Sequence, residues 1–378
     1  MELIGLLDFL LDPFNYLFWI FIITIIISSI IIVWRPFNVY IQFAYLNAKV
    51  EAIGNPYLTE KELNKLIESK NIIELKETIN TNKDYDIIGE WSNEIHNSLD
   101  DNFIKTIKQS KNDSSKKMKE FFNIFYEKID LYYIKLIIKN KFRNVSIDVF
   151  DSGKTNLKKT KKLMDEIIDS EIENIPEILI KYGFKENISN IFSPNEADFI
   201  LLDNLMDQYI INKFKNLKVP SKCIIGKQDF VNRMTDIKNI KNILRAKNLG
   251  YNEKTCDKLF LGDGQEISLW KFKELSQNED VYQIISNLEG TSYYNILKDS
   301  IEIFNQEKST QIFENLLDES YLNNLKEISI QNYVHIGPIL RFLISKEYEI
   351  MNLKIISKGI EEKINSDIIK KLIVKVNE

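Results

Sequence analysis

A phosphate-binding loop is the first chemistry that this sequence suggests, because Gly153, Lys154 and Thr155 stand together in the stretch DSGKTN. The pattern GxxxxGK[ST] needs another glycine five residues before Gly153, and that position holds Asp148. An aspartate there would repel phosphate and block the close approach of the backbone. The stretch therefore predicts a surface linker rather than a nucleotide site.

Metal and acid–base chemistry would need histidines or cysteines in groups, and the chain has only two of each. His96 and His335 are far apart, and Cys223 and Cys256 form no CxxC pair. A lone histidine is more often a satisfied core or surface residue than a catalyst. No nucleophile with a neighbouring base can be assembled. We expect no catalytic, cofactor-binding or metal site, and two reduced structural thiols.

The composition describes a folded helical chain. Its 378 residues are 44% hydrophobic and 28% charged, with a formal net charge of -5, so nucleic acid is not an expected partner. Nor do we expect a small-molecule substrate, since no site for one emerges. The 12 glycines and 7 prolines supply little turn chemistry for many short strands, while long runs carry apolar residues at helical spacing. An all-α fold follows.

An uncharged segment from Phe14 to Trp34, FNYLFWIFIITIIISSIIIVW, has the length of a bilayer core at about 1.5 Å per residue. The acidic leader before it, residues 1–13, has no Lys or Arg and no small-residue cleavage site follows, so we interpret the segment as a membrane anchor rather than a secretory signal. Arg35 and Lys49 follow the span. Basic residues after the span and an acidic leader before it predict a cell-membrane protein whose large C-terminal part is cytoplasmic.

One phrase occurs three times in the remaining chain: DLYYIKLIIK from Asp130, DIKNIKNILR from Asp236 and EIMNLKIISK from Glu349. Each copy begins with an acid, and Tyr133 stands where the other two copies have asparagine. A second landmark, Leu-Asp-x-x-Phe/Met/Tyr, precedes the three acids by 30, 33 and 31 residues. We take as architectural repeat anchors Asp130, Asp236, Asn239, Glu349 and Asn352.

These landmarks predict four segments: the leader and transmembrane helix (1–34) and three similar helical bundles (35–129, 130–235 and 236–378). We expect each anchor acid to start a helix, where it would favour the positive end of the helix dipole. Ile240 and Leu353 share a repeat position and should be buried. Thr59 and Glu62 should form a capping box. Two lysine runs, Lys105 to Lys119 and Lys154 to Lys162, are most simply solvated faces, and the alternative is that they bind acidic headgroups or an acidic partner loop.

The chain resembles the C subunit of archaeal A-type (V-type) ATP synthases, the relative of the d subunit of V-ATPases. The resemblance covers about residues 36 to 378. It rests on three stretches: AYLNAKVEAIGNPYLTEKELNKLIESKNIIELKETI, DIKNIKNILRAKNLG with its later GDG turn, and GPILRFLISKEYEIMNLKIISKGIEEKI. It implies a non-catalytic, funnel-shaped protein with three helical domains in pseudo-threefold arrangement. Its implied partners are the central-stalk subunits and the membrane rotor ring, between which it would pass torque.

The leader and apolar helix depart from this family, whose members are usually peripheral. Because a rotor subunit turns beside a stationary stator, and because the join at Arg35 and Pro36 is short, we expect the helix to lie inside the ring. The other interpretation of the sequence is a free-standing, membrane-anchored helical-repeat scaffold. Co-purification with ATP synthase subunits would separate the two.

Overall fold

The computed structural model describes residues 14, 16–54, 57–81, 84–143, 157–184, 191–193 and 196–375. Over these residues the regular secondary structure is helical apart from one antiparallel pair of two-residue strands, β1 (Phe192–Ser193) and β2 (Glu196–Ala197). The expected all-α class is confirmed. The helices are α2 (Tyr16–Ile53), α3 (Glu60–Ile67), α4 (Ile72–Asn80), α5 (Ser92–Asp113), α6 (Lys119–Phe142), α7 (Lys158–Asp169), α8 (Ile175–Lys181), α9 (Phe199–Asn216), α10 (Ile224–Asn248), α11 (Glu253–Asp257), α12 (Leu269–Gln277), α13 (Val281–Asn287), α14 (Ser292–Leu297), α15 (Ile301–Glu307), α16 (Gln311–Gln331), α17 (Gly337–Glu361) and α18 (Ser366–Leu372).

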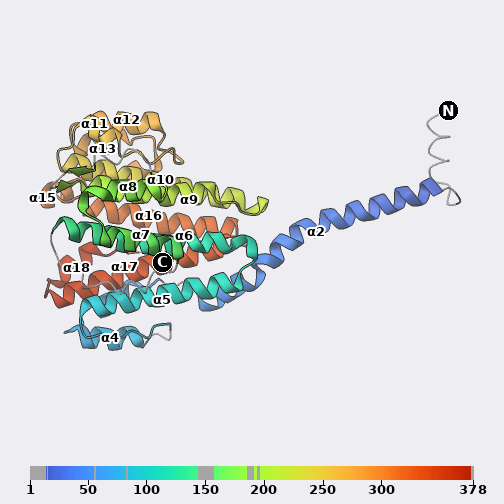
Figure 1. Cartoon of the computed structure of the whole chain (residues 1–378), viewed down its shortest axis with the longest axis horizontal. Coiled ribbons are helices and arrows are strands. Elements are labelled where there is room, and N and C mark those ends of the chain that lie inside the picture. Colours follow the sequence, from blue (N-terminus) through green and yellow to red (C-terminus); the bar gives the residue numbers. More distant parts are fainter. Residues whose placement is uncertain are drawn as a thin grey trace.

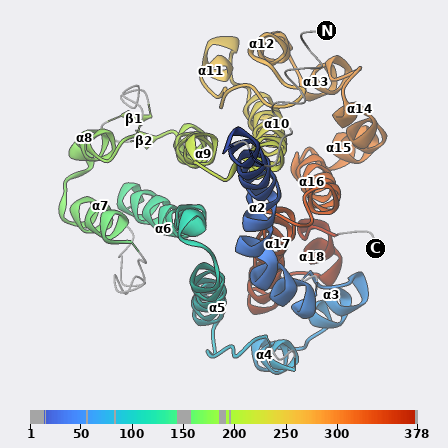
Figure 2. The same cartoon turned by 90° about the vertical axis from the view of Figure 1, so that its right-hand side faces the viewer.

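Six long helices form a closed ring. In order around the ring, α5 contacts α6, then α9, α10, α16 and α17 follow, and α17 contacts α5 again. Figure 2 is a view down the axis of this ring, with the shorter helices arranged around its outside. The last long helix thus packs against the first, so the two ends of the ring-forming chain are joined by tertiary contacts.

Aromatic side chains pack between the ring helices. Five successive helices each contribute one ring to a continuous series of aromatic contacts, with centroids 5.3 to 6.4 Å apart. The series is Phe125, Phe214, Phe230, Tyr321 and Tyr348. Ile240 and Leu353 are fully buried, as their shared position in the repeat predicts. Burial of such large apolar surfaces is the main stabilising contribution to the ring.

The first outer helix begins as the sequence predicts. Thr59 accepts a hydrogen bond from the Glu62 backbone N–H, and Glu62 accepts one in return from the Thr59 N–H at 2.8 Å. This capping box is confirmed. Beyond it, Leu63 and Leu66 turn into the core, which fixes the face of α3 that meets α17 and α18.

Helix α2 leaves the body as a long single helix (Figure 1). Its segment Tyr16–Trp34 has a mean hydropathy of 2.8, and none of it is buried within the protein. Phe14 lies just before the helix. We expected a short join at Arg35 and Pro36, and this is wrong, because the backbone stays helical through both residues as far as Ile53. A proline inside a helix removes one hydrogen bond, and here the helix continues past it.

Candidate functional site: buried acids and a cycle of ion pairs

The three anchor acids lie in the middle of long helices, not at their starts. Asp130 is near the centre of α6, Asp236 near the centre of α10 and Glu349 near the centre of α17. Each is at most 1% exposed. Helix-start capping is therefore the wrong explanation for these acids. A carboxylate buried in mid-helix needs hydrogen-bond donors from another element, and each of the three has them.

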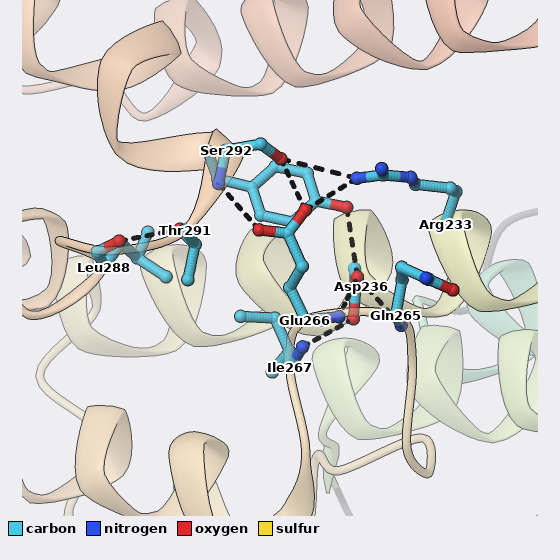
Figure 3. Close-up of polar contacts among 9 residues, drawn as sticks. Arg233, Asp236, Gln265, Glu266, Ile267, Leu288, Thr291 and Ser292 are labelled. Atoms are coloured by element: carbon cyan, nitrogen blue, oxygen red, sulfur yellow. Dashed lines mark hydrogen bonds and ion pairs between the residues drawn. The ribbon is translucent and has the colours of Figure 1, made fainter. Parts of the chain in front are cut away.

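Asp236 holds the segment that precedes α12. Its carboxylate accepts hydrogen bonds from the backbone N–H groups of Gln265, Glu266 and Ile267 at 3.0, 2.8 and 2.9 Å. The Tyr293 hydroxyl donates a fourth bond at 3.1 Å. Figure 3 shows the backbone of Gln265, Glu266 and Ile267 around this carboxylate. The Asp236 side chain thus satisfies three successive backbone N–H groups of the turn before α12.

The turn can approach this closely because of its glycines. Gly262 has a φ of +114°, a conformation that residues with a Cβ rarely adopt. A Cβ added at Gly264 would lie 1.9 Å from Asp236 Oδ1. The GDG turn seen in the sequence is therefore required for contact with the anchor acid.

Burial raises the pKa of the Asp236 carboxyl, and the backbone N–H donors and Tyr293 oppose that rise. Burial and the neighbouring carboxylate raise the pKa of Tyr293, so this hydroxyl stays protonated and available as a donor. Nearby, Glu266 accepts bonds from Ser292 and from Arg233, the latter at 2.7 Å. Burial raises the pKa of Glu266, but the Ser292 bonds and the Arg233 charge outweigh it and hold that pKa below its usual value.

The other two acids contact different outer segments. Glu349 Oε1 accepts hydrogen bonds from the Tyr85 hydroxyl and from Lys346 Nζ, which lies 3.0 Å away. Burial raises the pKa of Glu349, and Lys346 opposes that rise. Asp130 accepts a bond from the Thr160 hydroxyl at the start of α7. In all three cases the acid ties an outer segment to a long helix.

Asn239 and Asn352 make equivalent hydrogen bonds to backbone groups. The Asn239 side chain accepts from the Leu261 N–H at 2.9 Å and donates to the Gly262 carbonyl at 3.1 Å. The Asn352 side chain accepts from the Val374 N–H at 3.0 Å and donates to its carbonyl at 2.7 Å. Tyr133, which takes the asparagine position in the copy on α6, donates instead to the carboxylate of Asp100.

A cycle of ion pairs links the three copies, and sequence reasoning did not find it. Each anchor acid is followed five residues later by a lysine, and each lysine pairs with the aspartate of a Leu-Asp landmark on the adjoining hairpin. The pairs and their N–O distances are Lys135–Asp203 at 3.1 Å (α6 to α9), Lys241–Asp318 at 2.5 Å (α10 to α16) and Lys354–Asp100 at 2.6 Å (α17 to α5). The shared lysine position in the three phrases could have revealed it.

The cycle predicts graded effects on stability. We expect Lys241→Ala to lower the free energy of unfolding by about 3 kcal/mol, because it leaves Asp318 buried without its cation. The two side chains are only 10% and 9% exposed. Lys135→Ala should cost about 1 kcal/mol or less, since Asp203 is 31% exposed and keeps Lys139 at 3.4 Å. Urea denaturation of the full chain in detergent micelles, followed by circular dichroism, measures both. Equal losses would contradict this account.

The remaining candidate residues are structural. His96 Nε2 lies 2.9 Å from both the Lys354 carbonyl and Ser357 Oγ, and burial lowers its pKa. Cys223 and Cys256 are buried free thiols, and burial raises the pKa of Cys223 to about 11. Among the described residues no group of His, Cys, Asp or Glu could hold a metal ion. The DSGKTN stretch and the leader, residues 1–13, lie outside the described residues.

Known proteins are similar to this chain over most of its length. The family model "ATP synthase (C/AC39) subunit" matches residues 46–372. The A-type ATP synthase C subunit of Methanocaldococcus jannaschii is 28% identical over 379 residues, covering 94% of this chain and 93% of that protein. The corresponding C subunits of Methanobrevibacter smithii and Pyrococcus horikoshii are each 27% identical, covering 90% of this chain and 90% and 92% of theirs. The chain therefore belongs to the ATP synthase (C/AC39) subunit family.

Proposed function

We propose that this chain is a non-catalytic coupling subunit of an A-type ATP synthase. It would join the central stalk to the membrane rotor ring and pass torque between them, so that ion transport is coupled to ATP synthesis or hydrolysis. The relatives' shared name supports membership of such a complex. The protein would sit in the cell membrane through a single span, Tyr16–Trp34, with its body in the cytoplasm.

The observation that carries this proposal is the continuity of α2. The same helix that forms the apolar span enters the body, where Phe43 and Leu46 are buried. There Asn47 donates to the carbonyls of Tyr333 at 3.0 Å and His335 at 2.8 Å. A body held this way cannot rotate without its membrane helix, which suits a part that turns with a rotor.

The closed ring suits the transmission of torque for a second reason. Three helical hairpins, α5–α6, α9–α10 and α16–α17, would be the cores of three similar units, and each hairpin is joined to the next by one lysine–aspartate pair. The boundaries of these units would lie outside the hairpins rather than at 129/130 and 235/236, which fall within α6 and α10. A load applied to one unit would then pass to both neighbours through packed helices. We propose these as the three domains of a pseudo-threefold body, with Asp130, Asp236 and Glu349 at equivalent positions.

Affinity purification of the tagged full chain from its native membranes tests the proposal. We expect stalk and rotor-ring subunits to co-purify in fixed stoichiometry, and the complex to retain ATPase activity that the isolated chain lacks. Purification with unrelated partners and without ATP synthase subunits would contradict the proposal and favour a free-standing membrane-anchored scaffold.

A further inference from the structure

The three turns between the paired long helices lie at one end of the ring. We call this surface the tip face and define it as residues 114–119, 217–225 and 330–335, which connect α5 to α6, α9 to α10 and α16 to α17. The lysine run Lys105 to Lys119, which the sequence alone assigns to a solvated face, contributes to the first turn. Figure 1 shows the helix pairs ending on the side from which α2 projects.

Contacts between residues place the first and third turns beside α2, and the second turn beside the third. Ser115 in the first turn donates to Gln42 of α2 at 3.4 Å, and Asn47 of α2 donates to carbonyls of the third turn. Directly after the second turn, a Cβ added at Gly226 in α10 would lie 2.7 Å from the side chain of Asn332 in the third turn. The tip face is therefore a single surface around the base of the apolar helix.

The charge of the tip face differs from that of the whole chain. The net charge of the chain is -5, but the three turns contain no Asp or Glu. Their five lysines are all exposed and none has an ion-pair partner among the described residues: Lys116, Lys117, Lys119, Lys218 and Lys222. Large exposed apolar side chains accompany them, namely Ile224, Ile225, Ile330, Tyr333 and Val334 at 41 to 69% exposure. Lysines mixed with exposed apolar residues are typical of surfaces that contact anionic membranes.

The tip face contacts α2 just beyond the end of the apolar span, which brings this surface to the lipid headgroups. Gln42, which contacts the first turn, lies eight residues after Trp34, or about 12 Å along the helix. The headgroup region occupies roughly the first 5 to 8 Å outside the hydrocarbon core. The lysines of the first turn thus lie within about one Debye length, roughly 8 Å at physiological salt, of the headgroups. Trp34 is exposed at the depth where aromatic side chains favour the interface.

The tip face also has a concave part. A cavity of about 590 Å³ opens between α6 and α9, and its lining includes Lys117 and Lys218 from the first two turns. Lys213 also lines it and is 3.3 Å from Glu127. The rest of the wall is mixed: Glu120, Gln208, Asn212 and Asn216 are polar, whereas Ile124 and Leu217 are apolar. A headgroup phosphate could meet the two unpaired lysines here, opposed by Glu120, the one carboxylate of the lining.

We propose that the tip face is a docking surface for anionic phospholipid headgroups. It adds a second, electrostatic attachment to the membrane helix and holds the body at a fixed height and orientation above the bilayer. The proposal rests on the membrane insertion of α2 that the proposed function includes. Its test must therefore depend on lipid charge, which insertion and co-purification do not.

Lysine footprinting of the full chain in lipid nanodiscs tests the proposal. One set of discs is made of phosphatidylcholine alone, and the other contains about one-third phosphatidylglycerol. We expect an amine-reactive ester to modify Lys117, Lys218 and Lys222 at least about threefold more slowly in the anionic discs, with the difference lost in high salt. Co-migration of the chain with the neutral discs establishes insertion separately.

The chain supplies matched controls. Lys254 and Lys258 in and after α11 are exposed and follow the far end of α10, so their modification rates should not change with lipid charge. Lys218→Gln with Lys222→Gln should weaken the protection of Lys117, whereas Lys254→Gln with Lys258→Gln should not. Equal rates in the two kinds of disc would overturn the proposal. Protection that appears only in the assembled complex, whatever the lipid, would also overturn it and indicate an acidic protein partner.

Discussion

Replacement of Asp236 by alanine is expected to lower the free energy of unfolding by about 4 kcal/mol, with the largest effect among single polar substitutions in the body. The change removes the acceptor of three backbone N–H groups and of the Tyr293 hydroxyl. The Ile267 N–H and the Tyr293 hydroxyl would stay buried, and an unsatisfied buried donor costs roughly 1 to 3 kcal/mol, whereas the partly buried N–H groups of Gln265 and Glu266 would cost less. Partial entry of water into the space left by the carboxylate should keep the total below the simple sum.

Urea denaturation of the full chain in detergent micelles measures this loss. Asp236→Asn should lower the free energy of unfolding by less than Asp236→Ala. The remaining side-chain oxygen of asparagine still accepts hydrogen bonds, although its NH₂ group would face other donors. Gly264→Ala should lower the free energy of unfolding nearly as much as Asp236→Ala does, since the added Cβ would displace the Asp236 carboxylate. The matched control is Glu327→Ala on an exposed face, with an expected change within about 0.5 kcal/mol. A small loss for Asp236→Ala would show that the turn before α12 holds its conformation without the acid.

Local patterns in this sequence predict elements well. The capping box at Thr59 and Glu62 involves residues three apart, and the burial of Ile240 and Leu353 follows from helical periodicity around each position. Such features depend on neighbours within one or two turns of helix, so a single sequence contains the necessary information. The three copies of the anchor phrase were recognisable for the same reason.

The role of the anchors could not be predicted in this way. An acid that begins an apolar phrase resembles a helix start, yet α10 begins twelve residues before Asp236, because Phe230 and Val231 already face the core. The donors to Asp236 come from residues 265–267 and 293, which only the folded chain brings near. The pairing of Lys354 with Asp100 joins residues 254 positions apart. Contacts of this range depend on the closure of the ring.

Two lysines in the middle of the apolar span are expected to release the protein from the membrane. Ile25→Lys with Ile26→Lys places two charges near the centre of the segment, where each costs about 2.5 to 3.5 kcal/mol. Both side chains are exposed and contribute nothing to the core of the body, so its stability should not change. We expect most of the wild-type chain, and little of this variant, to remain with membranes after alkaline extraction.

The matched control makes the same substitution in the same helix outside the span. Ile41→Lys with Tyr45→Lys alters two side chains that are 51% and 64% exposed. Both lie beyond the Tyr16–Trp34 segment, and this variant should remain in the membrane. Equal retention of the two variants would mean that the apolar helix does not span the bilayer. Equal loss would point to a general effect of charge on α2.

If the chain turns with a rotor, as proposed above, the position of α2 within that rotor follows from its continuity with the body. A helix fixed to a turning body and standing outside the ring would meet the stator once in every turn, and an unbroken helix from Tyr16 to Ile53 has no linker to avoid the collision. We therefore expect the span inside the ring, near the axis, in lipid. Its Ile-rich surface suits that place because all of its backbone groups can pair within the helix, with Ser28 and Ser29 as the points of closest helix contact. Photocrosslinkers at Phe18 and Ile25 in the assembled enzyme should give products with the inner helices of the rotor ring, and products with the stator would refute this placement.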